Sequence, residues 1–141
     1  MDFGENKEYI DTMFSEMNFV EQELGGCRFI NCSFLGANME GMTTRGCSFE
    51  GCSFKSARLN ASLHNSSAFT NCEFTYANLF GANFNECKML GSSFIEVNTL
   101  GLTITRGDWS YTNLRLANLK GLDLRQVKLV RADLYKCNLE K

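Results

Sequence analysis

Cysteine and histidine are the residue types in this 141-residue chain that could act as nucleophiles or bind a metal ion. The chain has seven cysteines and one histidine, and the stretch from Gly46 to His64 brings Cys47, Cys52 and that histidine close together in sequence. Neighbouring cysteines lie five residues apart, which is wider than the Cys-x-x-Cys pair of a typical zinc knuckle. A single histidine also supplies no Ser-His-Asp or Cys-His constellation. We therefore predict no catalytic residue, no metal site, no cofactor and no enzyme activity.

Composition indicates a soluble chain. Hydrophobic residues make up 44% of the sequence, but no apolar run approaches the roughly 20 residues of a membrane span. The N-terminal segment MDFGENKEYID is acidic and polar, unlike a secretory signal, so we expect a cytoplasmic protein. Seven is an odd number of cysteines, so the thiols cannot all pair within the chain, and we expect free cysteines.

A five-residue period organises the whole sequence. Reading every fifth residue from Phe14 to Leu139 gives 26 positions, which we call centre positions, and all but Thr44, His64 and Thr99 are large and apolar. The residue two before a centre is usually small, and all seven cysteines fall in this column. The column two after a centre holds nine of the twelve glycines. The cysteines therefore belong to an architectural repeat and act as small hydrophobic residues.

A period of five fits neither an α-helix nor a β-strand, so the chain must bend once per repeat. Centre and small residues point inward, while glycine, asparagine and aspartate suit the turns. Four bends close a square coil of 20 residues, and successive coils stack like parallel strands about 4.8 Å apart. The inward ladders should run through aromatic residues, and we name these structural core residues: Phe34, Phe49, Phe54, Phe74, Phe94 and Trp109.

The repeats CSFEG, ANLFG, ANFNE, ANLKG and ADLYK resemble those of the pentapeptide-repeat proteins. The resemblance covers residues 12–141 and implies an all-β fold, a right-handed quadrilateral β-helix of about six and a half coils. We expect residues 1–11 to form an N-terminal cap segment and residues 12–141 to form a single domain. The rod can end at the C-terminus by meeting a second rod end to end as a homodimer, or the native chain can continue.

Two segments depart from the repeat. Thr44 and His64 are 20 residues apart and should be neighbours on one face, with Met42 filling the space that the threonine leaves. His64 could be buried with a local hydrogen bond, or a one-residue bulge could turn Leu63 inward and expose the imidazole. Residues 97–111 form the second weak segment, where Leu102 and Gly107 occupy the small column and a distortion is expected.

The charges are distributed unevenly along the rod. Residues 1–26 carry a net charge of −6, residues 27–105 balance, and residues 106–141 carry a net charge of +4. A candidate acidic patch consists of Asp11, Glu16, Glu21 and Glu23. These charges could simply solvate the surface, or they could steer a charged partner. The basic end could bind nucleic acid through Arg106, Arg115, Arg125, Arg131 and Lys136, but no aromatic residues interleave there as stacking platforms, so we do not expect direct nucleic-acid binding.

Outward apolar residues give the second candidate surface. In the twenty-residue register they fall along one edge of the rod: Tyr76, Phe80, Ile95, Leu100 and Leu116. Apolar residues that gather at exposed positions suggest a protein interface. The alternative is that imperfect repeats tuck these side chains away.

The resemblance implies a protein-binding role. Well-known pentapeptide-repeat proteins mimic B-form DNA, bind DNA gyrase and protect it from quinolones, which makes a topoisomerase-binding DNA mimic of the quinolone-resistance type the specific hypothesis. The alternative is a structural or regulatory scaffold that binds an unrelated protein. This rod departs from the DNA mimics in turning basic toward its C-terminus, in having no loop that interrupts the repeat, and in lacking a hydrophobic C-terminal helix.

Overall fold

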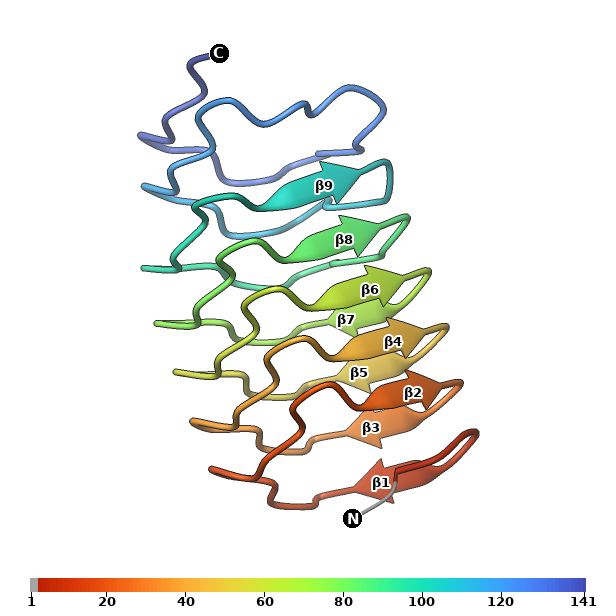
Figure 1. Cartoon of the computed structure of the whole chain (residues 1–141). Coiled ribbons are helices and arrows are strands. Elements are labelled where there is room, and N and C mark those ends of the chain that lie inside the picture. The colour runs from red at the N-terminus through yellow and green to blue at the C-terminus, as the bar shows by residue number, and fades with distance from the viewer. Residues whose placement is uncertain (1–2) are drawn as a thin grey trace.

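The chain winds into a solenoid in which each coil lies on top of the one before it (Figure 1). The computed structural model describes residues 3–141, which contain strands and turns but no helix, and hence no helix long and apolar enough to cross a membrane. Nine strands of three residues each lie on two sides of the coil. They are β1 (Glu8–Ile10), β2 (Glu23–Gly25), β3 (Arg28–Ile30), β4 (Thr43–Arg45), β5 (Ser48–Glu50), β6 (Leu63–Asn65), β7 (Ala68–Thr70), β8 (Asn83–Asn85) and β9 (Thr103–Thr105).

All strand pairs are parallel and join residues twenty apart in sequence, as in Phe29 with Phe49. One sheet has the order β1-β3-β5-β7, and the other has the order β2-β4-β6-β8-β9. Two further sides carry isolated bridges with the same separation, such as Met13 with Ser33 and Asn18 with Asn38. Each coil therefore has four hydrogen-bonded sides, which confirms the predicted quadrilateral β-solenoid.

The number of coils differs slightly from the expected six and a half. The larger sheet has five strands, so the strand-bearing part of the solenoid is about five coils long. Beyond β9 the chain keeps coiling through isolated bridges, the last of which joins Asn118 to Asn138. Leucine replaces phenylalanine in these last coils, and their centre residues Leu124, Leu129 and Leu134 are only partly buried.

The corners of the coil explain the period of five. Every fifth residue from Asn6 to Lys136 has a positive φ, between 51° and 78°. Nine of these corners are glycine, the residue that adopts this conformation without steric cost. Eighteen are other residues, including Ala61, Tyr76 and Leu116, so the fold enforces the left-handed turn even where the side chain opposes it.

The core consists of stacked aromatic rings. One ladder has neighbouring ring centroids 4.8–5.2 Å apart and contains Phe14, Phe34, Phe54, Phe74 and Phe94. The other has spacings of 4.7–5.1 Å and contains Tyr9, Phe29, Phe49 and Phe69. The two ladders meet edge to face, as Phe49 does with Phe54 at 5.4 Å. All six residues named above as structural core, including Trp109, are at most 2% exposed.

The cysteines fill the space beside these rings. Cys47 donates a hydrogen bond to the carbonyl oxygen of Leu24 at 3.4 Å, and Cys87 donates one to that of His64 at 3.3 Å. Burial raises the pKa of the Cys47 thiol, and it raises that of Cys87 to about 11. All seven cysteines are free thiols. The cysteines therefore act as packing residues, and burial holds the thiols of Cys47 and Cys87 in their protonated form.

The described part of the expected cap segment, residues 3–11, adds to the first coil and also covers it. β1 pairs with β3, and Glu5 bridges Gly25. Phe3 is buried at this end, with its ring 4.6 Å from that of Phe19. Residues 1–2 lie outside the described part of the chain. Phe3 thus closes the apolar end of the rod, which an open solenoid requires.

His64 belongs to a closed network of hydrogen bonds inside the rod. Its Nδ1 lies 2.8 Å from the hydroxyl oxygen of Thr44, and its Nε2 lies 3.0 Å from that of Ser62. Ser62 donates its own proton to the carbonyl oxygen of Leu59 at 2.6 Å, so it accepts from Nε2–H. Nδ1 must then accept from Thr44, whose oxygen accepts in turn from Ser67 at 2.8 Å. The network therefore fixes one neutral tautomer of the imidazole.

The expectation of a bulge at His64 is wrong. The register runs unbroken from Thr44 through His64 to Phe84. His64 is fully buried, whereas Leu63 points outward. The alternative expectation of a buried histidine with local hydrogen bonds is correct, because the hydroxyl groups of Thr44 and Ser62 satisfy both ring nitrogens without a shift of the backbone. Met42 and Thr44 are both buried side by side, as expected from their complementary sizes.

The corner residues yield a first prediction. Replacing Ala61 with glycine is expected to raise the free energy of unfolding by about 1 kcal/mol, because Ala61 has a φ of 58°. The matched change Gly81→Ala, at the same corner one coil later, is expected to lower it by a similar amount through strain alone. A Cβ on Gly81 would meet only the Ala61 nitrogen, at 4.0 Å. Urea unfolding of the two variants and the parent measures both effects. Equal free energies of unfolding for all three proteins would contradict the prediction.

His64 yields a second prediction. Burial lowers its pKa from an ordinary value of 6.5 to about 3. The unfolded chain therefore binds more protons than the folded chain between these values, and stability is lost as the pH falls below 6.5. We expect the free energy of unfolding to drop by about 2 kcal/mol between about pH 7.5 and about pH 5. His64→Phe, which removes the titrating group, is the control; an unchanged pH dependence in that variant would refute the assignment.

Candidate interaction surface

Eight ion pairs join outward charged side chains in the described residues, and seven of them link different coils. Arg28 lies 3.4 Å from Glu8 and 3.9 Å from Glu50, and Arg45 lies 3.9 Å from Glu5. These pairs are about half exposed, and each contributes little to stability. Their consequence for the surface is that positive and negative charges alternate along the rod.

The residues of the candidate acidic patch surround the first coil. Asp11, Glu16 and Glu21 are three successive corners, with φ between 51° and 58°. Glu23 begins β2 on the following side. All four are exposed, but they face different sides of the rod. The structure therefore places them as a ring at the N-terminal end and not as a stripe along its length.

The five candidate apolar residues border one side of the rod, with Tyr76, Ile95 and Leu116 at one corner and Phe80 and Leu100 at the next; we call this side the apolar edge. Their exposed fractions are 56% for Tyr76, 50% for Phe80, 39% for Ile95, 68% for Leu100 and 68% for Leu116. The Tyr76 amide donates to the carbonyl oxygen of Ile95, which places these two residues in adjacent coils. The side chains are therefore presented to solvent and not tucked away.

Sequence reasoning missed one neighbour of this edge. Tyr135 is about half exposed, and its carbonyl oxygen accepts from the Leu116 amide at 2.9 Å. The guanidinium of Arg115 lies 4.6 Å from the centre of its ring. Tyr135 follows a centre position, so the twenty-residue register could have found it beside Leu116.

The ladder of backbone hydrogen bonds opens at one place next to the apolar edge. Within residues 3–141, no backbone hydrogen bond joins 96–106 to 116–126, although these segments are one coil apart. Pairing is intact on either side of the opening, where Phe94 donates to Asn113 at 2.9 Å and Lys128 donates to Gly107 at 3.0 Å. We call this opening the cleft. The expected distortion within 97–111 is therefore present.

Large side chains in the small column explain why the coils separate here. Val97 stands where the three preceding coils have alanine, and Leu102 stands one coil after Ala82. Overfilled cores push the backbone apart. Thr99 adds to the effect, because it replaces an apolar centre residue and spends its hydroxyl on the carbonyl oxygen of Asn118, at 2.5 Å. Met42 causes no such opening, since the centre residue that follows it, Thr44, is small, whereas Leu102 precedes the large centre residue Ile104.

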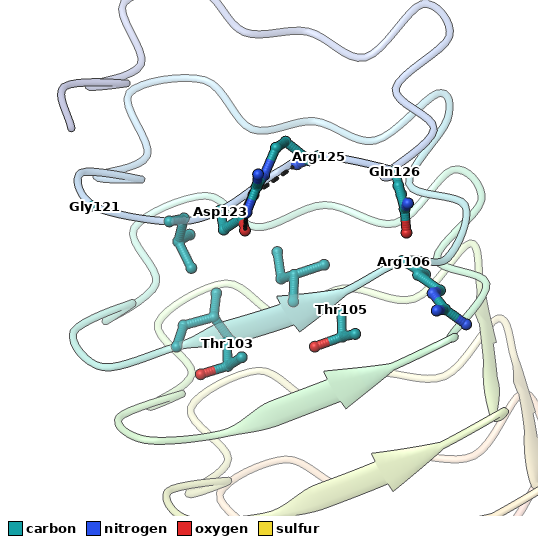
Figure 2. A pocket seen from close by; sticks show the side chains of 10 residues that line it. Thr103, Thr105, Arg106, Gly121, Asp123, Arg125 and Gln126 are labelled. Carbon is teal, nitrogen blue, oxygen red and sulfur yellow. Dashed lines mark hydrogen bonds and ion pairs between the residues drawn. The ribbon is translucent and has the colours of Figure 1, made fainter.

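The cleft is hollow. One cavity of about 660 Å³ lies between β9 and residues 121–126, and a second of about 270 Å³ adjoins it. Figure 2 shows Thr103 and Thr105 on the β9 wall and Asp123 and Arg125 on the opposite wall. Leu100 lines the smaller cavity, so the cleft continues directly into the apolar edge.

The charged groups at the mouth of the cleft are paired. Arg125 lies 2.7 Å from Asp123, and its side-chain hydrogen bond lowers the pKa of that carboxyl to about 2. Arg106 lies 3.0 Å from Glu86. In the part of the chain that the structure describes, no three histidine, cysteine, aspartate or glutamate side chains gather as metal ligands would. The arrangement suits recognition of a polymer surface.

Sequence reasoning found only one wall of this site. Leu102 stood out because it breaks the repeat, but Leu122, which breaks it in the same way, was not singled out, and Asp123 and Arg125 occupy ordinary outward positions. The signal that could have found them is the register, since each lies twenty residues after a member of the weak segment.

Comparison with known proteins identifies related sequences and folds. The family model described as pentapeptide repeats matches the chain in eight copies, over residues 47–90, 72–98 and 105–141. No curated protein matches the chain. A trypsin-treated variant of QnrB1, a plasmid-mediated fluoroquinolone resistance protein, superposes with a TM-score of 0.93 at 21% sequence identity, covering 97% of this chain and 69% of that one. A second trypsin-treated QnrB1 variant gives a TM-score of 0.90 at 21% identity, covering 94% of this chain and 68% of that one.

Proposed function

The chain belongs to the pentapeptide-repeat family, and we propose that it is a non-catalytic rod that binds a protein, with DNA gyrase as the specific partner. The observation that carries the proposal is the apolar edge beside the open cleft. A surface where five large apolar side chains gather is typical of a protein interface. Gyrase is the candidate because family members of the quinolone-resistance type bind it, and the QnrB1 fold resembles this one. In this proposal the protein acts in the cytoplasm, where gyrase is.

The backbone at the apolar edge supports an interaction role. Tyr76 and Leu116 are corners with φ of 61° and 62°, a conformation that is costly for large side chains. Many other corners in this chain are glycine, which would relieve the strain. The side chains at these two corners stay exposed, where a partner can contact them, although Tyr111 is a similar corner residue away from this edge.

The charges favour a second candidate function, a scaffold for an unrelated protein. DNA mimicry needs a row of acidic groups along the rod, but acidic residues beyond the first coil are largely paired with arginine or lysine. This observation weakens the DNA-mimic mechanism more than it weakens protein binding. A partner that recognises the apolar edge requires no acidic row.

The basic end gives little support to direct nucleic-acid binding. Of the five basic residues that suggested it, Arg106, Arg115 and Arg125 are each paired with a carboxylate. Neutralised side chains release few counterions from a phosphate backbone, and such release dominates the affinity of proteins for nucleic acid.

The gyrase proposal predicts an effect on supercoiling. Purified chain added to DNA gyrase is expected either to inhibit supercoiling or to restore it in the presence of a fluoroquinolone. Supercoiling that is unchanged in both conditions would leave the scaffold function as the better candidate. Retention of DNA on the protein at low salt, lost steeply as salt rises, would instead indicate nucleic-acid binding.

Variants locate the surface that is responsible. Replacing Phe80 and Leu100 with serine is expected to weaken the gyrase effect about tenfold or more, because both side chains sit at the centre of the apolar edge. The matched control replaces Ile10 and Val130 with serine, which are also exposed but lie on another side of the rod. Equal losses in both variants would refute the assignment of the apolar edge.

A further inference from the structure

We propose that the cleft binds an extended segment of the partner polypeptide, which adds a strand to the open edge of β9. The inference rests on the proposed protein-binding function and names the site and the form of the ligand. β9 pairs with β8 on one side only, and residues 121–126 on its other side form no strand with it. A parallel edge of this kind inside a rod is otherwise avoided, because unpaired strand edges attract other chains.

Specific backbone groups are left open in the cleft. In the preceding coil, the Gly81 amide donates to Leu100 at 3.0 Å and the Glu86 amide donates to Thr105 at 2.8 Å. Among the described residues, the equivalent amides of Gly101 and Arg106 have no backbone acceptor. These backbone amides therefore lack the carbonyl acceptors that the next coil supplies elsewhere in the rod.

Charge complementarity selects a peptide as the occupant. The formal charges at the mouth cancel, since Arg106 is paired with Glu86 and Arg125 with Asp123. The partial charges of alternating N–H and C=O groups along β9 remain. A polypeptide backbone has the same alternation at the same spacing, and this is the basis of recognition by strand addition. A nucleic acid has a row of phosphates and would meet no free cation from these two arginines.

The side chains along the cleft define the peptide further. Leu102 and Ile104 point toward the core side of the cavity, and Leu122 faces them from the next coil. Ile104 is 6% exposed, whereas its counterpart Phe84 in the preceding coil is fully buried. Thr103 and Thr105 are exposed on the outer side. A strand placed here would present alternate residues to each side, so the ligand should have apolar residues at every second position.

The cavity is large enough for such a segment. A volume of about 660 Å³ falls within the usual range for ligand sites, and the adjoining cavity extends it toward Leu100. Further residues of the same partner could then cover the apolar edge. The cleft and the edge would form one interface, with main-chain hydrogen bonds in the first part and apolar contacts in the second.

The test uses the whole chain and synthetic peptides. A displayed library of random peptides of about nine residues is selected on the protein, and the enriched peptides are synthesised. We expect enrichment of sequences with alternating apolar residues, and binding that changes the fluorescence of the only tryptophan, Trp109, in the coil between the two walls. Methylating single peptide amides is expected to weaken binding about tenfold at every second position and to have little effect between them.

A pair of variants tests the place of binding. Val97→Ala combined with Leu102→Ala removes the side chains that separate the coils, so the ladder should close. Peptide affinity should fall about tenfold or more, and hydrogen exchange of the Arg106 amide should slow as it gains an acceptor. The matched control is Met42→Ala, a large residue of the same column in a coil with intact pairing, and it should bind peptide as the parent does.

Several outcomes would overturn the proposal. These are no enrichment of peptides, amide methylation without alternation, unchanged binding by the Val97→Ala, Leu102→Ala variant, or binding of a single-stranded oligonucleotide in place of peptides. The methylation series needs no variant, so it remains decisive if the double variant does not fold. Gyrase plays no part in these measurements. Peptide binding without any effect on supercoiling would support the cleft and exclude gyrase as the partner. A gyrase effect that the double variant retains would support gyrase as the partner and exclude the cleft as its binding site.

Discussion

The structure depends on the near equality of two distances, the rise per coil and the separation of stacked aromatic rings. A coil of twenty residues rises by the spacing of hydrogen-bonded strands, about 4.8 Å, which is also the distance at which aromatic rings stack face to face. The phenylalanine ladders follow this rise with centroid separations near 5 Å. Backbone pairing and ring stacking therefore reinforce each other. A slip of one residue would misplace every ring, so the chain accepts left-handed corners even at alanine, tyrosine and leucine.

The same constraint explains where the rod opens. Ring stacking and backbone pairing hold the coils together while the small column stays small and the centres stay aromatic. Val97, Thr99 and Leu102 violate both conditions within six positions, and pairing fails between their coil and the next. His64 violates only the second condition, and backbone pairing is intact around it. The hydrogen-bond network of Thr44, Ser62 and Ser67 satisfies its polar atoms, and Phe84 stacks on its ring at 4.9 Å. A polar residue with partners is accommodated in the core, whereas excess volume is not.

Function in such a rod must reside on the outside. Among the described residues, inward positions are occupied by rings, small residues and cysteine thiols that pack against one another. Outward positions are free of packing constraints, so they can differ from coil to coil without disturbing the fold. The apolar edge uses this freedom at Tyr76, Phe80 and Leu100, and the cleft adds backbone groups that a regular coil would hide. In our proposal these two features together form the surface that binds a polypeptide.

The sequence alone determined the solenoid and the inward ladders, because a strict five-residue period leaves one way to bury Phe14 through Leu139. It named the residues of the apolar edge, but only the structure showed that they are exposed. It also pointed to residues 97–111 as irregular. Only the tertiary structure decided between a bulged and a buried His64, because hydroxyl groups from residues 44 and 62 had to meet the ring. Only the tertiary structure supplied the second wall of the cleft, since residues 121–126 show no more than the single large residue Leu122 in the small column. Their loss of pairing arises from side chains one coil away, a contact between segments that the local pattern does not contain.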